Sequence, residues 1–158
     1  MFEFIIDAII QGIGNPLIVA VVLGFLPISE VRGAAIYAFS INQPWLIIPA
    51  AMANMLVAPV ILFFWNIVNI PYWGKLILGK RLEGKLLGMG KHYESQGFLA
   101  IAIFIGIPLP LTGVYSGTLV AELLGIKRKH TLVAACVGVV MATVLMFLFL
   151  GGLKIILG

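Results

Sequence analysis

Apolar residues run through most of this chain in long blocks that polar residues interrupt at only a few places. Residues 44–70 form one such block, and a helix of that length, at about 1.5 Å per residue, crosses a bilayer. Residues 130–153 form a second block of the same kind. Pro49 and Pro59 lie inside the first block and predict kinks there. The pattern therefore predicts two membrane-spanning helices.

Two further apolar blocks, residues 16–41 and 97–126, are broken in the middle by "FLPIS" and "IPLPLTG". The second block has basic residues on both sides, so a single crossing would leave one basic group on the wrong side of the membrane. It is also too short for two crossings, since each needs about 20 residues. We therefore expect both blocks to enter the membrane and return to the same side, as re-entrant helical hairpins.

Two less apolar segments complete a single membrane domain over residues 1–158. Residues 72–95 space leucines among lysines, which predicts a basic amphipathic helix, with a solvated connecting loop as the alternative. Residues 1–15 place apolar side chains at helical spacing, with Glu3 and Asp7 on the other face. This pattern predicts a short amphipathic helix that is too short to span a membrane alone.

Composition agrees with lipid as the main solvent, because 62% of the residues are hydrophobic and only 10% are charged. The basic residues gather in the segments 71–95 and 127–130, which the positive-inside rule places in the cytoplasm. We therefore expect a multi-pass protein of the cell (inner or plasma) membrane, with no nucleic-acid partner. The single cysteine, Cys136, lies in an apolar run, and the sequence predicts no metal site, no cofactor and no enzyme site.

The two broken blocks share a motif, "LPISEVRG" from residue 26 and "LPLTGVYSG" from residue 109. Four residues match at a separation of 83 positions: Leu26, Pro27, Ser29 and Val31 correspond to Leu109, Pro110, Thr112 and Val114. Each motif is followed by a helical arm, a connector and a spanning block. Because each repeat crosses the membrane once, the second enters from the opposite side. This inverted-topology repeat is typical of secondary transporters.

The chemistry of the two breaks predicts a binding site near the middle of the membrane. Ser29 and Thr112 are placed to cap the helical arms that follow them, whose positive ends attract anions. Arg32 adds a permanent positive charge. Glu30 either carries a proton or binds a partner, in Arg32 or in the other hairpin. The alternative for both charged residues is a structural tie between the hairpins.

Other residues complete the candidate substrate- or ion-binding set. Pro27, Pro110 and Gly113 shape the tips of the hairpins. Asn54, in the first spanning block, either bonds a hairpin tip or packs. Two secondary candidates are Glu122, for which pairing with the nearby basic cluster is the alternative, and Tyr115, for which aromatic packing is the alternative. These assignments follow from position and residue type alone.

The segments "PISEVRGAAIYAF" and "IPLPLTGVYSGTLVAELLGIKRK" resemble the two conserved blocks of the small multidrug export protein family. The resemblance covers nearly the whole chain, although the family's usual "RGAIP" is "RGAAIY" here. A more distant similarity links the chain to the DedA proteins of the VTT superfamily. That resemblance implies two opposed re-entrant hairpins with buried acidic and arginine residues, and proton-coupled movement of lipids such as polyprenyl phosphates. It points to Glu30 and Arg32 as functional positions.

Together these patterns predict an all-α integral membrane transporter for an anionic or amphiphilic substrate such as a lipid phosphate. Two full spans scarcely enclose a path, so we expect a homo-oligomer, most simply a dimer, surrounded by membrane lipids. One alternative is an exporter of lipophilic cations that uses Glu30 and Glu122 as counter-ions, which the neighbouring Arg32 disfavours. The others are a non-transporting membrane scaffold and a channel.

Overall fold

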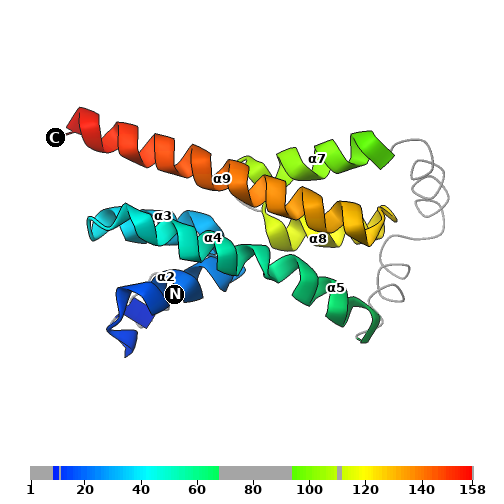
Figure 1. Ribbon diagram of the computed structural model, residues 1–158, viewed down its shortest axis with the longest axis horizontal. Helices are drawn as coiled ribbons and strands as arrows, with labels where there is room; N and C mark the ends of the chain where they lie inside the picture. Colours follow the sequence, from blue (N-terminus) through cyan, green and yellow to red (C-terminus); the bar gives the residue numbers. More distant parts are fainter. Residues whose placement is uncertain (1–8, 11, 68–93, 110–111, 158) are drawn as a thin grey trace.

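The computed structural model describes residues 9–10, 12–67, 94–109 and 112–157, and these form an all-helical fold (Figure 1). The predicted basic segment 72–95 and most of the predicted amphipathic helix 1–15 lie outside the described residues. The helices are α2 (Pro16–Phe25), α3 (Glu30–Ser40), α4 (Ile47–Met55), α5 (Val57–Ile67), α7 (Glu94–Gly106), α8 (Val114–Leu123) and α9 (Arg128–Leu157), with a 3₁₀ turn over Pro44–Leu46 before α4. The prediction of an all-α protein is confirmed.

Among the described residues, two helical segments are long and apolar enough to cross a membrane, Pro44–Trp65 and Arg128–Ile156. The first is broken at Leu56 into α4 and α5, because Pro59 has no N–H to donate to the carbonyl four residues earlier. Pro49 lies in the first turn of α4, where a missing N–H costs little. The segment α4–α5 and the continuous helix α9 run antiparallel through the molecule (Figure 1).

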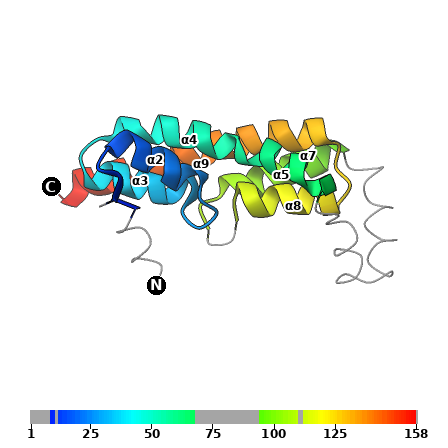
Figure 2. The same cartoon turned by 90° about the horizontal axis from the view of Figure 1, so that it is seen from below.

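The remaining described helices form two hairpins, α2–α3 and α7–α8. They enter from opposite ends of the molecule, and their loops lie side by side in its middle (Figures 1 and 2). The first hairpin packs on α4, and its helix α3 also contacts α9. The second hairpin packs on α9, and its helix α8 also contacts α5. Each hairpin therefore rests on the spanning segment that follows it and touches the spanning segment of the other half.

Glycines allow the hairpins to approach the spanning helices closely. A methyl group added at Gly24 of α2 would lie 2.8 Å from the Cα atom of Ala50 in α4. A methyl group added at Gly138 of α9 would lie 2.6 Å from Cβ of Ile105 in α7. Small residues are used in this way at helix interfaces in membranes, where van der Waals contact replaces the hydrophobic driving force.

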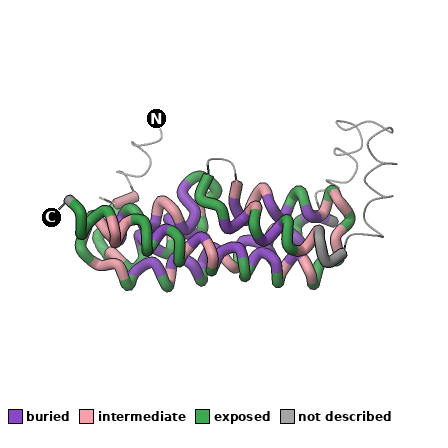
Figure 3. The backbone as a smooth tube through the Cα atoms, turned by 90° about the horizontal axis from the view of Figure 1, so that it is seen from above, coloured by how far each residue is buried: buried purple, intermediate pink, exposed green. Residues whose placement is uncertain are grey.

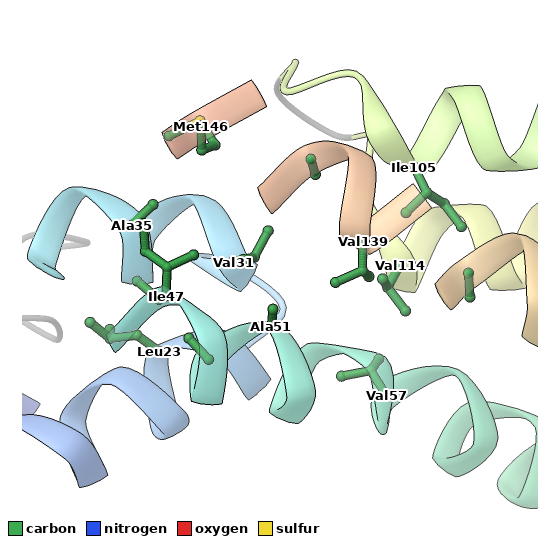
Figure 4. Close-up of a cluster of buried hydrophobic side chains, with 14 of the residues drawn as sticks. Leu23, Val31, Ala35, Ile47, Ala51, Val57, Ile105, Val114, Val139 and Met146 are labelled. Carbon is green, nitrogen blue, oxygen red and sulfur yellow. The ribbon is translucent and has the colours of Figure 1, made fainter. Parts of the chain in front are cut away.

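The distribution of buried residues matches this arrangement of the helices. The buried residues run along the axis where hairpins and spanning helices meet, and the outer faces are exposed (Figure 3). At the centre, Val31 and Val114 from the two hairpins pack near Val139 of α9 (Figure 4). The outer faces are themselves apolar, since Ile48, Phe63 and Leu148 each expose more than 60% of their surface. Such a continuous apolar exterior is typical of a surface that faces lipid.

Candidate functional site

The loops of the two hairpins are joined through Arg32, in the first turn of α3. Its Nη1 donates to the carbonyl oxygen of Leu109, and its Nη2 to that of Thr112. Nη2 also lies 3.2 Å from the carbonyl oxygen of Ile107 and 3.1 Å from Oγ1 of Thr112. These carbonyls lie just beyond the C-terminal end of α7, where a helix leaves acceptors unpaired and its dipole is negative. The guanidinium of Arg32, which belongs to the other hairpin, supplies donors to these carbonyls and a positive charge to the negative end of the dipole.

Glu30 binds the other broken end of the second hairpin, the N-terminus of α8. Its side chain is buried, and its carboxylate accepts hydrogen bonds from the backbone N–H groups of Val114 and Tyr115. The contact is close, because a methyl group added at Gly113 would lie 2.5 Å from Cδ of Glu30. The first N–H groups of a helix have no partner within the helix, and the dipole there favours a negative charge. Glu30 therefore caps α8 from the opposite hairpin.

The backbone of Glu30 adopts a conformation that glycine would favour, with φ at 49°. A left-handed residue with a side chain costs about 1–2 kcal/mol. Such strain persists where several contacts hold it in place. Here the Glu30 N–H donates to the carbonyl of Leu26 at 2.9 Å, while the carboxylate is held by α8. The strained turn positions an acidic side chain against the other hairpin.

A contact in the reverse direction comes from Tyr115. Its hydroxyl donates to the carbonyl oxygen of Phe25, the last residue of α2. Tyr115 lies 83 positions after Arg32, which is the separation between the two sequence motifs. Each hairpin thus sends one side chain from the same repeat position to the end of the other hairpin's first helix. By the same separation, Gly113 corresponds to Glu30, and these two residues are in contact.

The prediction that Ser29 and Thr112 cap the helices after them is wrong. The Ser29 hydroxyl makes no capping bond and donates backwards to the carbonyl of Leu23 in α2. Oγ1 of Thr112 lies 2.8 Å from the carbonyl oxygens of Ile107 and Leu109, and the residue before α8 is Gly113. Both hydroxyls instead bond backbone carbonyls at the end of the preceding helix or just after it. The first N–H groups of α8 are bound by the carboxylate of Glu30.

The other predicted residues fall in different places. Pro27 is exposed in the loop between α2 and α3, and Pro110 lies outside the described residues. Asn54 is buried in α4. Glu122 lies at the far end of α8, away from the loops, with its Oε1 3.6 Å from Nε of Arg128. Its position matches local pairing with the basic cluster.

Sequence reasoning missed two features of the contact. Tyr115 was a secondary binding candidate with aromatic packing as the alternative, although the 83-residue separation of the two motifs already aligns it with Arg32. The acceptors of Arg32 are backbone carbonyls, which leave no trace in side-chain chemistry.

A separate open groove of about 230 Å³ lies between the start of α4 and α9. Trp45, Ile48, Val144 and Leu148 are among its lining residues, and its wall is almost entirely apolar. It carries no charged group, so it suits a lipid chain better than a substrate with a polar head. The contact between the hairpin loops is therefore the candidate site.

The helical fold, its apolar exterior and its two candidate spans define a membrane protein with a charged contact between two hairpins. A family model described as "Putative small multi-drug export protein" matches residues 30–145, well over half of the chain, and the protein belongs to this family. The matched range begins at Glu30 and includes every polar side chain of the loop contact except Ser29. Neither the search of curated proteins nor the search of solved structures found a match.

Proposed function

We propose that this protein is a membrane transporter that exports a small amphiphilic molecule, with the contact between its hairpin loops as the gate. One observation carries the proposal. Glu30 and Arg32, two residues apart in one hairpin, bind the two broken helix ends of the other hairpin. Charged side chains are costly in a membrane and are found mainly where they serve a substrate or ion path.

The proposed architecture is an inverted-topology repeat with two re-entrant hairpins. It is supported by the entry of the hairpins from opposite ends of the molecule (Figure 1) and by the matching way in which each packs on its own spanning segment. The equivalent roles of Arg32 and Tyr115 support it as well. In transporters of this kind the binding site lies between the repeats, near the midplane.

The geometry favours an anionic head group on the transported molecule. When the loops separate, the Arg32 guanidinium and the N–H groups at the start of α8 both lose their present partners. A phosphate or carboxylate can replace them, because it binds guanidinium and helix N–H groups alike. Protonation of Glu30 would favour its release from α8, so we expect export to be coupled to protons. A lipid phosphate, such as a polyprenyl phosphate, fits this description.

The family's description favours a second candidate, the export of lipophilic cations. In that case Glu30 would act as the counter-ion after leaving α8. Arg32 opposes this function, because it would lie beside any cation bound at Glu30. For either candidate we expect a homo-oligomer in the cell membrane, with the basic segments 71–95 and 127–130 in the cytoplasm.

Flux measurements in proteoliposomes test both candidates. Wild type, Arg32→Ala and Glu30→Gln would be reconstituted and given a short-chain polyprenyl phosphate or tetraphenylphosphonium, with and without a pH gradient. Lys129→Ala removes an exposed charge far from the loops and is the matched control.

Saturable movement of the phosphate that Arg32→Ala abolishes and Lys129→Ala preserves would support the anionic substrate. Movement of the cation that depends on Glu30 would support the second candidate. Movement that never saturates and ignores the pH gradient would indicate a channel. If wild type moved neither probe faster than empty liposomes, transport would be refuted in favour of a scaffold.

A further inference from the structure

Asn54 is a fully polar side chain in the interior of the fold without a hydrogen-bond partner. Only 1% of its surface is exposed, and neither Oδ1 nor Nδ2 has a partner. A primary amide offers two donors and two acceptor sites, and burial without partners is unfavourable because water would satisfy them all. An apolar residue of similar size would fit such a position better, so stability alone does not account for Asn54.

Asn54 lies at the level of the contact between the hairpin loops. It is three residues from both Ala51 and Val57, so the three side chains share one side of the α4–α5 segment. In Figure 4, Ala51 and Val57 lie beside the central cluster that contains Val31 and Val114. Val31 stands between Glu30 and Arg32, and Val114 follows Gly113. The unpaired amide therefore lies on the side of the segment that faces the residues next to the gate in sequence.

The buried hydroxyl of Thr118 in α8 also has no partner, but its position has a local explanation. A threonine hydroxyl in a helix can turn toward the carbonyl four residues earlier. Thr143 does so in α9, with its Oγ1 2.7 Å from the carbonyl oxygen of Val139. A single bond of this kind satisfies a hydroxyl, whereas it leaves one end of an amide unpaired. Asn54 therefore keeps both ends of its amide free to bind a polar group.

We infer that the Asn54 amide is a binding position for the polar head of the transported molecule, and that it gains its partner when the hairpin loops separate. The inference rests on the proposed transport function and adds a residue of the spanning segment to the binding site. Together with Arg32 and the N–H groups at the start of α8, an amide donor would complete the coordination of a phosphate head group.

The test is a comparison of stability and transport in Asn54→Leu, Asn54→Ala and the control Thr118→Val. Thermal unfolding in detergent would be measured beside flux of the short-chain polyprenyl phosphate and of tetraphenylphosphonium in proteoliposomes. We expect Asn54→Leu to melt at a higher temperature than wild type, because it removes an unsatisfied buried amide. We expect its flux to fall about tenfold or more, the ratio expected for losing one hydrogen bond to a charged group. Thr118→Val should transport as wild type does.

Either of two results would overturn this inference and leave the proposed transport function standing. One is wild-type flux in Asn54→Leu or Asn54→Ala. The other is a lower melting temperature in Asn54→Leu, which would make Asn54 a structural residue with a partner in the resting fold. If Asn54→Leu failed to fold, the flux of Asn54→Ala relative to wild type would decide. Absence of wild-type flux for both probes would instead overturn the transport function and this inference together.

Discussion

Replacing Arg32 with methionine removes the guanidinium and keeps a side chain of similar length. The carbonyl oxygens of Leu109 and Thr112 then lose their charged donor. The Thr112 hydroxyl can satisfy only one acceptor, since it has a single proton. The substitution therefore leaves the carbonyls beyond α7 without their charged donor and removes the direct tie of Arg32 to the opposite loop. Neither loss involves the spanning helices, so we expect the effect to be confined to the gate.

The magnitude follows from the bonds lost. A hydrogen bond from a charged donor contributes about 1.5–3 kcal/mol, and we count only the two bonds to the carbonyls of Leu109 and Thr112. Arg32 is half-buried, so we take the lower end of the sum, about 3 kcal/mol. That free energy corresponds to a shift of about 150-fold in the equilibrium between joined and separated loops. A shift of this size converts a minor separated state into a substantial population.

Pulsed electron paramagnetic resonance would report the shift. Nitroxide labels at residues 36 and 119 place one exposed reporter on α3 and one on α8, in a chain whose only native cysteine is replaced by Cys136→Ser. Wild type should give one narrow distance distribution. Arg32→Met should give a second, broader population, and Lys129→Met, an exposed charge removal, should match wild type. An unchanged narrow distribution in Arg32→Met would refute the view that Arg32 holds the loops together.

Three further substitutions distinguish the contact between the hairpin loops from contacts elsewhere in the fold. Gly113→Ala should push the Glu30 carboxylate off α8, and the same labels should then report a separated population; a wild-type distribution would contradict this close contact. Gly24→Ala should lower the melting temperature, because its methyl group would meet the α4 backbone. The control Gly152→Ala, in α9, adds its methyl group in open space and should melt at the wild-type temperature or higher. Equal melting temperatures of the two variants would be inconsistent with this packing. Glu122→Gln should cost less than about 1 kcal/mol in chemical denaturation, since the side chain of its partner Arg128 is 48% exposed, and a larger loss would make this pair part of the core.

The helical elements could be predicted because membrane helices follow apolar block length, which is visible in the sequence. The breaks were visible for the same reason, as Pro27 and Pro108 interrupt apolar runs with residues that cannot continue a helix. Glu30 and Arg32 stood out because charged residues are rare in such blocks. These features depend on local composition, so one sequence was enough.

The partners of these residues could not be predicted, because they are backbone groups from the other hairpin. Sequence rules for helix caps assign the nearest hydroxyl, and at Ser29 and Thr112 that assignment failed. The carboxylate of Glu30, 84 positions before Val114, caps α8 instead. The left-handed backbone at Glu30 also has no sequence signal, since it arises from tertiary contacts rather than from glycine.

The two spanning segments differ in continuity, and this has a mechanical consequence. Helix α9 runs unbroken over 30 residues without a proline, and both hairpins touch it. The segment α4–α5 is interrupted at Leu56, close to the level of the gate. A bend at Leu56 would move α5, which contacts α8, relative to α4, on which the first hairpin packs. One candidate span is therefore continuous and the other is interrupted, and under the proposed function the interrupted span is the one that would bend when the loops separate.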